Sequence, residues 1–213
     1  MTQPILIMGA TSGIGFEATK LASDRGIPVR AFARSAAKLA DVPNVTPCPG
    51  DALNADDIKA AIDGTSAVIY ALGIRERLAM LWEEETLFSE STRLVIRTMT
   101  EAKVTRLVAI TGFGAGRSKS AMSSIEAIGH RAILGRPYAD KDRQEALITA
   151  SELDWTIARP VILSKGPLTG TYRVLRDVSS WRNGLISRKD VADYALKAAT
   201  EGLDIRADVV LAR

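Results

Sequence analysis

The sequence predicts an α/β protein in which helices cover both faces of a mostly parallel sheet. Three observations lead to this prediction. Short, continuous apolar runs of strand length recur along the 213 residues, and such runs are typical of strands that are covered on both faces. Segments with helical periodicity separate the runs, which favours right-handed βαβ units. A glycine-rich segment follows the first run directly, where doubly wound folds place a phosphate-binding turn.

The elements can be assigned in chain order. Strands are expected at residues 5–8, 29–33, 45–48, 67–72, 107–110, 155–158 and 209–211. Helices are expected between them at residues 14–25, 55–62, 84–102 and 140–151. The segment from Gly166 to Gly184 is the least regular and is interpreted as a lid over a site. The residues from Ser187 to Asp190 resemble a helix N-cap followed by an acid in the first turn.

Composition limits the class of protein. Apolar residues make up 46% and charged residues 25%, which is the ordinary share of a globular protein. At roughly 150 residues per domain the length corresponds to about 1.4 domains. We therefore expect one domain over residues 1–213, with a short substrate-side region around residues 161–186. The net charge of +3 is too small to indicate a basic nucleic-acid interface, so no nucleic-acid partner is expected.

Cysteine and histidine usage narrows the chemistry further. Cys48 is the single cysteine and His130 the single histidine. These counts exclude an internal disulfide, a cysteine-based metal cage and a multi-histidine metal site, so no metal is expected. The first residues carry no basic targeting signal, and no window approaches 18 consecutive apolar residues, so no membrane association is expected. A cytoplasmic location is the simplest expectation.

The glycine-rich segment has the spacing of a dinucleotide-binding loop. Gly9 permits a tight turn off the first strand, Gly13 lets the backbone approach a pyrophosphate, and Gly15 lets the helix pack close to the sheet. The free N–H groups and the dipole of the following helix then face the phosphates. This pattern predicts a Rossmann fold. A turn with a purely structural role is the alternative.

The end of the second strand indicates which cofactor is bound. An NAD-preferring site has a carboxylate there, but residues 29–35 contain no acid, and Arg34 lies 19 residues after Gly15. A guanidinium can bind a 2′-phosphate through two hydrogen bonds, and Ser35 offers a hydroxyl, so the sequence predicts NADP. Solvation of Arg34 at the surface is the alternative. Asp51 follows the third strand and either binds the adenine amino group or caps the helix near Ala55.

Several motifs in the same order resemble one family over almost the whole chain. The chain resembles the atypical NAD(P)-binding branch of the short-chain dehydrogenase/reductase superfamily, which includes the NmrA-like proteins and the biliverdin reductase B/flavin reductase-like proteins. The motifs that carry the resemblance lie at residues 9–15 (GATSGIG), 50–51 (GD), 71–73 (ALG), 106–112 (RLVAITG), 153–160 (LDWTIARP) and 186–192 (ISRKDVA).

The resemblance implies a set of cofactor-binding residues. The pyrophosphate would be bound by the glycine loop, which also contains Thr11, Ser12 and Ile14. The adenine would be flanked by Asp51, Ala52 and Leu53, and the adenosine and ribose by Ala71, Leu72 and Gly73. The chain would pass the nicotinamide at Pro160, Val161 and Ile162.

The resemblance also implies three candidate catalytic residues. Thr111 occupies the place of an active-site Ser or Thr, and Lys141, in a Lys-x-x-x-Glu pattern, matches the lysine that contacts the nicotinamide ribose. Relatives with full dehydrogenase chemistry place a tyrosine four residues before that lysine, whereas here this residue is Pro137 and Tyr138 is displaced by one position. The displacement argues against tyrosine-dependent alcohol oxidation. Packing in the protein interior is the alternative role for Tyr138.

These observations favour an NADPH-dependent oxidoreductase that passes hydride to a small conjugated acceptor, such as a flavin, a quinone or a similar carbonyl. An NADP(H)-binding sensor or scaffold without turnover, and a sugar epimerase or dehydratase, are the alternatives, because the fold alone does not choose among them. The small-molecule substrate and the oligomeric state are left open. Four arginines in the late irregular region either receive an anionic substrate or are solvated: Arg173, Arg176, Arg182 and Arg188.

Overall fold

The computed structural model describes residues 3–73, 86–121 and 138–213, and its main feature is an eight-stranded sheet in the order β3-β2-β1-β4-β5-β6-β10-β8. All neighbouring pairs are parallel except β10 with β8, which is antiparallel. The strands are β1 (Ile5–Met8), β2 (Val29–Phe32), β3 (Val45–Cys48), β4 (Ala67–Tyr70), β5 (Arg106–Ile110), β6 (Asp154–Pro160), β8 (Arg173–Leu175) and β10 (Ala207–Ala212). The seven predicted strands are confirmed within a few residues at their ends.

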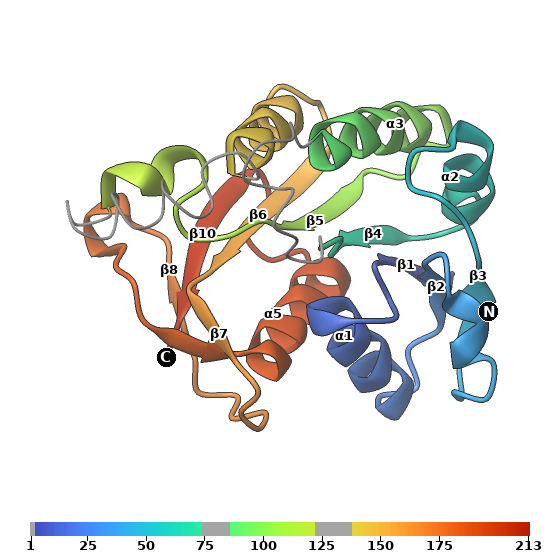
Figure 1. Ribbon diagram of the computed structural model, residues 1–213, viewed down its shortest axis with the longest axis horizontal. Coiled ribbons are helices and arrows are strands. Elements are labelled where there is room, and N and C mark those ends of the chain that lie inside the picture. Colours follow the sequence, from blue (N-terminus) through green and yellow to red (C-terminus); the bar gives the residue numbers. More distant parts are fainter. Residues whose placement is uncertain (1–2, 74–85, 122–137) are drawn as a thin grey trace, which may run out of the picture.

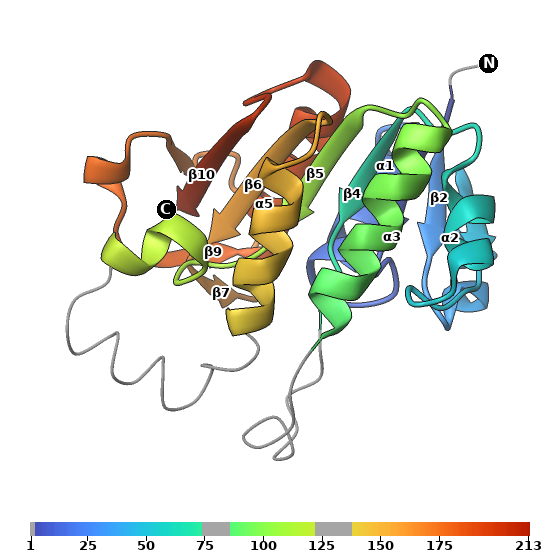
Figure 2. The ribbon, with the colours of Figure 1, turned by 90° about the horizontal axis from the view of Figure 1, so that it is seen from above.

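Helices cover both faces of this sheet (Figure 1). One face carries α1 (Gly13–Asp24) and α5 (Arg188–Glu201), and the other carries α2 (Ala55–Ile62), α3 (Leu87–Glu101) and a helix over residues 138–149. Figure 2 shows the second group of helices side by side across the sheet. The doubly wound α/β fold is therefore confirmed. The expected start of the third helix at residues 84–85 lies outside the described residues, as do His130 and Pro137.

Smaller elements complete the chain. A second, two-stranded sheet is formed by β7 (Ile162–Ser164) and β9 (Leu185–Ser187), which pair in parallel. Short 3-10 turns lie at η1 (Ala36–Leu39), η3 (Gly116–Ala121) and η4 (Val178–Ser180). None of the helices in the described ranges has the length and apolar character needed to cross a membrane.

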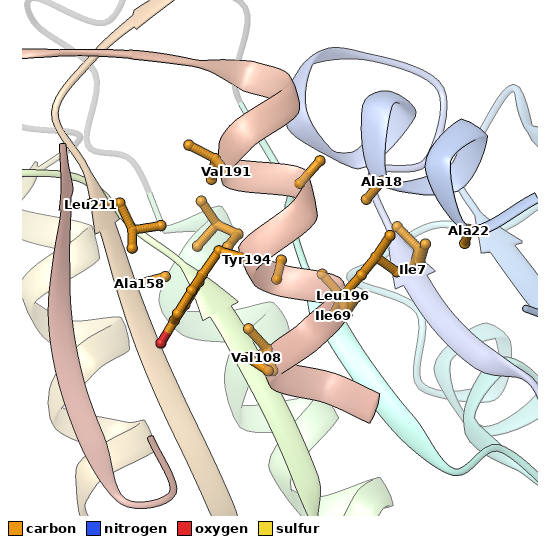
Figure 3. Packing of buried hydrophobic residues seen from close by; sticks show 14 of the residues in the cluster. Ile7, Ala18, Ala22, Ile69, Val108, Ala158, Val191, Tyr194, Leu196 and Leu211 are labelled. Carbon is orange, nitrogen blue, oxygen red and sulfur yellow. The ribbon is translucent and has the colours of Figure 1, made fainter. Parts of the chain in front are cut away.

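The sheet separates two apolar cores. Alternate residues of a strand point to opposite faces, so β1 supplies Ile7 to the core beneath α1 and α5, and Leu6 to the core beneath the other helices. Figure 3 shows the first core, in which Ala18 of α1 and Leu196 of α5 pack over Ile7. All four residues of β1 are buried. Double-sided burial is the physical reason for the continuous apolar runs in the sequence.

Two features of the late segment differ from the sequence prediction. The sequence predicted only the start of helix α5, whereas the helix continues to Glu201. At its start the Ser187 hydroxyl accepts a hydrogen bond from the backbone N–H of Asp190 at 2.9 Å, which confirms the predicted cap. In the segment interpreted as a lid, residues 173–175 form β8 and pair with β10 instead. That part of the segment is the edge of the main sheet.

Two of the four late arginines, Arg173 and Arg176, lie apart from each other. Arg173 bonds to the carbonyl oxygen of Arg213, beyond the last residue of β10, at 2.6 Å. Arg176 pairs with Asp204, which precedes the first residue of β10, at 2.6 Å. The two side chains therefore engage opposite ends of one strand, and they do not form a common anion site.

Candidate cofactor and active site

The glycine loop joins β1 to α1 at the carboxyl edge of the sheet. Gly9 has a φ of +79°, and a Cβ there would lie 2.5 Å from the carbonyl oxygen of Ala71. A Cβ on Gly15 would overlap the carbonyl oxygen of Gly9. The absence of side chains at these two positions lets the loop pack against the end of β4 and lets α1 start directly on the loop.

Gly13 has a different role, because it faces open space. Its φ is +56°, and a Cβ there would meet no described atom within 4 Å. Ser12, the N-cap residue of α1, has an extended backbone and no side-chain capping bond, and the first turn contains no acidic residue. The N–H groups of the first helical turn therefore lack a side-chain cap and a repelling carboxylate. This arrangement fits an anion such as a pyrophosphate.

The turn after β2 is tied to the glycine loop. The Ser35 hydroxyl donates to the Thr11 hydroxyl at 3.1 Å. Arg34, the neighbouring residue, is exposed and makes no hydrogen bond or ion pair to a described residue. A guanidinium can bind a phosphate through two hydrogen bonds, so the role of Arg34 at a 2′-phosphate stays a prediction.

Of the two roles left open for Asp51, helix capping is wrong. The α2 cap is Asn54, whose side-chain oxygen accepts from the backbone N–H groups of Asp56 and Asp57 at 2.9 and 3.1 Å. Asp51 is exposed and instead accepts from the backbone N–H of Leu53 at 3.0 Å. The adenine-binding role stays a prediction.

The remaining predicted cofactor residues follow the ends of β4 and β6. Ala71 continues β4 through a hydrogen bond from its N–H to the carbonyl oxygen of Met8 at 3.1 Å, and Leu72 and Gly73 follow it. At the other strand end, Pro160 accepts from the N–H of Phe113 at 3.0 Å. The two residues that follow Pro160 differ in burial, because Val161 is buried and Ile162 is 60% exposed.

Thr111 follows β5 and is buried. Its backbone N–H donates to the carbonyl oxygen of Ala158 at 3.0 Å. Its hydroxyl donates to Oε1 of Glu145 at 2.7 Å. Since a hydroxyl has one proton, Thr111 can only accept a hydrogen bond from a further partner while this bond persists. The candidate role of Thr111 as an active-site residue stays a prediction, with its hydroxyl available to a ligand as an acceptor.

A buried ion-pair network surrounds Glu145. Arg159 donates to both carboxylate oxygens, from Nε at 3.0 Å and from Nη2 at 2.7 Å. The third nitrogen of Arg159 donates to Asp208 at 2.6 Å, and Arg117 pairs with the same carboxylate from the surface. Both guanidinium groups lie over the ring of Trp181, at 5.1 and 5.5 Å from its centroid.

The pKa values follow from this pairing. Burial opposes the charge of Arg159, but the hydrogen bonds and charges of Glu145 and Asp208 outweigh burial and raise the Arg159 pKa. Burial likewise opposes the charge of Asp208, and the two arginines outweigh it and lower the Asp208 pKa. Both groups are therefore charged at neutral pH.

Tyr138 lies against the loop that follows Thr111. A Cβ on Gly112 would lie 2.7 Å from the Tyr138 hydroxyl oxygen, so the phenol approaches the backbone as closely as a glycine allows. Burial raises the pKa of Tyr138, and the charge of Glu145 raises it further. Tyr138 therefore keeps its proton at neutral pH, and it is not activated in the manner of a tyrosine whose pKa a neighbouring lysine lowers.

Lys141 lies between the helix at 138–149 and α3. Its ammonium nitrogen is 4.1 Å from the centroid of the Phe88 ring, a cation–π contact. Burial lowers the pKa of Lys141 to about 8, against the opposing charges of Glu145 and Asp140. The Asp140 carboxylate also accepts from the N–H groups of Phe88 and Ser89 at 2.8 and 3.3 Å, so it caps α3 and fixes the two helices together.

The structure thus brings the three predicted catalytic residues around one carboxylate. Thr111 bonds to Glu145, and Tyr138 and Lys141 both experience its charge. Sequence reasoning missed Glu145 and its partners Arg159 and Asp208 as parts of the site. Two signals point to Glu145 and Arg159: Glu145 lies four residues after Lys141, and Arg159 is a charged residue directly after the apolar pair Ile157 and Ala158.

Comparisons with known proteins show the family of the chain. The family model described as NAD(P)H-binding matches residues 9–202. ChuY from Escherichia coli CFT073 is 26% identical over 100% of this chain and 97% of that chain, with a TM-score of 0.81. ChuY from E. coli O157:H7, described as an anaerobilin reductase, is 25% identical over 98% of this chain and 96% of that chain, with a TM-score of 0.80.

A more distant structure supports the fold. A short-chain dehydrogenase/reductase from Veillonella parvula, solved in complex with NADP, is 16% identical over 100% of this chain and 95% of that chain, with a TM-score of 0.81. The family model spans most of the chain, and the glycine loop and the sheet order agree with it. The chain therefore belongs to the NAD(P)H-binding family, among the atypical proteins that resemble short-chain dehydrogenases/reductases.

Proposed function

We propose that this protein is an NADPH-dependent reductase that transfers hydride to a small conjugated acceptor, such as a flavin, a quinone or a similar carbonyl. One observation carries the proposal. The glycine loop after β1 and the cluster of Thr111, Tyr138 and Lys141 after β5 lie at the same carboxyl edge of the sheet, where open α/β sheets bind their ligands.

The choice of NADP rests on charge at the end of β2. Arg34 is exposed beside the glycine loop, and the segment contains no acid to bind a ribose hydroxyl. The open space at Gly13 fits the pyrophosphate, and Lys141 would contact the nicotinamide ribose. When bound, NADPH supplies the hydride, while the protein orients the ring and excludes water.

The state of the protons explains why a conjugated acceptor fits best. The Thr111 hydroxyl proton is held by Glu145, and Tyr138 has a raised pKa. Neither group is arranged to deliver a proton readily to an alkoxide. A conjugated acceptor spreads the charge that arrives with the hydride and can take its proton from solvent. The similarity to ChuY, described as an anaerobilin reductase, supports the same class of chemistry.

The hydrogen bond from Thr111 to Glu145 also favours a second candidate function. If the Thr111 hydroxyl donates to Glu145 because the site does not turn over a substrate, the protein is an NADP(H)-binding sensor of the NmrA-like kind. A sugar epimerase or dehydratase is less well supported, because the raised pKa of Tyr138 opposes its use as a base. A small-molecule substrate and a cytoplasmic location form part of the proposal, and the free thiol of Cys48 is consistent with a reducing compartment.

The test is NADPH oxidation in the presence of a panel of flavins and quinones. We expect at least one acceptor to sustain many turnovers per protein molecule, with acceptor reduction matching NADPH consumption. Tight NADPH binding with no consumption across the panel would instead establish the sensor. Absence of NADPH binding would contradict both functions.

Two substitutions separate the roles of Tyr138 and Lys141. Tyr138→Phe is expected to keep most of the reductase rate, because the phenol is not needed as a proton donor. Lys141→Ala is expected to raise the apparent KM for NADPH by about tenfold and to lower kcat, because a positioning contact to the cofactor is lost. Lys59→Ala, an exposed lysine on α2, is the control. Loss of activity in Tyr138→Phe alone would indicate a shifted tyrosine mechanism.

The Lys141 contact also predicts a pH dependence of cofactor binding. The pKa of Lys141 is about 8, so its ammonium is charged below that pH and neutral above it. The affinity for the anionic cofactor is therefore expected to fall as the pH rises through about 8 in the wild type. In Lys141→Ala this step is expected to be absent in a titration followed by cofactor fluorescence. A step that persists in the variant would show that another group titrates.

A further inference from the structure

We propose that Glu145 is a positioning residue of this site: its carboxylate holds the Thr111 hydroxyl as a hydrogen-bond acceptor for the bound cofactor or substrate, and seats the helix at 138–149 on the loop after β5. The inference rests on the proposed function. It assigns to Glu145 a role that is exerted through Thr111 and Lys141.

The contacts of Glu145 fix its orientation completely. The residue is 4% exposed. Oε1 accepts from Thr111 at 2.7 Å and from Nε of Arg159 at 3.0 Å, and Oε2 accepts from Nη2 of Arg159 at 2.7 Å. A bidentate arginine holds the plane of a carboxylate. The Thr111 hydrogen therefore has a fixed partner, and its free lone pair is left for a donor such as an amide.

The loop after β5 is shaped to receive this helix at two points. A Cβ on Gly116 would overlap Oε2 of Glu145, and a Cβ on Gly112 would lie 2.7 Å from the Tyr138 hydroxyl. Gly116 also has a φ of +50°. The two glycines therefore leave room for Tyr138 and Glu145, two side chains of one helix. These side chains contact the loop that begins with Thr111 at both points. This packing links the position of Thr111 to the presence of Glu145.

Glu145 also acts on Lys141 through charge. Tyr138, Lys141 and Glu145 are spaced three and four residues apart, so they lie on one face of the helix. The charged groups acting on Lys141 are Glu145 and Asp140 from its own helix, and Phe88 of α3 contributes its ring. Glu145 favours the ammonium form against burial. Removing its charge should make Lys141 lose its proton at a lower pH.

The test compares Glu145→Gln with Asp208→Asn in NADPH titrations over a range of pH. Each variant removes one carboxylate from Arg159 and keeps the side-chain volume, so each is expected to lower the melting temperature. Only Glu145→Gln removes the charge near Lys141, while its amide oxygen can still accept from Thr111. We expect it to lower the pH midpoint of NADPH binding by roughly one unit and to weaken binding at pH 7, while Asp208→Asn keeps the wild-type midpoint.

A second variant keeps the proposal falsifiable if Glu145→Gln does not fold. Thr111→Val removes the hydroxyl but keeps the charge of Glu145, so it is expected to weaken NADPH binding or raise the acceptor KM while the midpoint stays near 8. An unchanged midpoint in Glu145→Gln, the same shift in Asp208→Asn, or wild-type binding and KM in Thr111→Val would overturn the positioning role. If the wild type binds NADPH and the variants show none of the expected effects, the proposed function stands and only this inference is refuted.

Discussion

Gly13→Val is expected to abolish measurable NADPH binding while the protein stays folded. The position faces open space, where no described atom lies within 4 Å of a Cβ, and it opens the helix whose N–H groups would receive the pyrophosphate. A branched side chain would occupy the phosphate's place. We expect the affinity to fall by more than about a hundredfold, which corresponds to about 2.7 kcal/mol. Isothermal titration with NADPH measures this loss.

A matched control separates this effect from backbone strain. Gly26, at the other end of α1, also has a positive φ, +68°, and open space at its Cβ. Gly26→Val therefore carries a similar conformational cost but leaves the loop intact. It is expected to lower stability to a similar extent and to bind NADPH like the wild type. Unchanged affinity in a folded Gly13→Val protein would show that the loop is only a structural turn.

Gly116→Ala is expected to cause the largest loss of stability among conservative substitutions in the site. The new Cβ would overlap the Glu145 carboxylate and lie 3.1 Å from Nη2 of Arg159. The carboxylate would have to leave a buried bidentate pair, and breaking such a pair costs about 3 kcal/mol or more. Urea denaturation is expected to show this decrease in the free energy of unfolding.

Gly170→Ala is the control for Gly116→Ala. Gly170 has a φ of +67° and open space at its Cβ, so alanine there carries only the left-handed backbone cost of about 1–2 kcal/mol. The difference between the two variants isolates the overlap with Glu145. Equal losses in the two proteins would mean that the ion pair accommodates the methyl group by shifting.

The fold could be predicted from the sequence because its signals are local. Burial of β1 on both faces produces a continuous apolar run, and the glycines of the loop are spaced by the geometry of one turn and one helix start. Helix α5 gave a weaker signal because its buried residues include Asp190, Asp193 and Tyr194. These polar side chains are satisfied by distant partners, such as Arg25 for Asp193, and such pairing leaves no periodic apolar pattern.

The site was only partly predictable, because some of its contacts join residues that are distant in the sequence. Thr111, Tyr138 and Lys141 follow from motif positions in the chain. The carboxylate that joins them does not, because Glu145 becomes a buried hub only when β6 brings Arg159 beside it and β10 brings Asp208 beside Arg159. The sequence shows the Thr111 hydroxyl but not the carboxylate that accepts its hydrogen bond.

The preference between NADPH and NADH tests the central claim most directly. Equilibrium titrations of the wild type with both cofactors are expected to show NADPH bound about ten- to a hundredfold more tightly, because an arginine–phosphate pair contributes roughly 1.5–3 kcal/mol. Arg34→Ala is expected to remove most of this preference, and Arg93→Ala, which removes an exposed arginine on α3, is expected to keep it. Equal affinities of the wild type for NADPH and NADH would contradict the account.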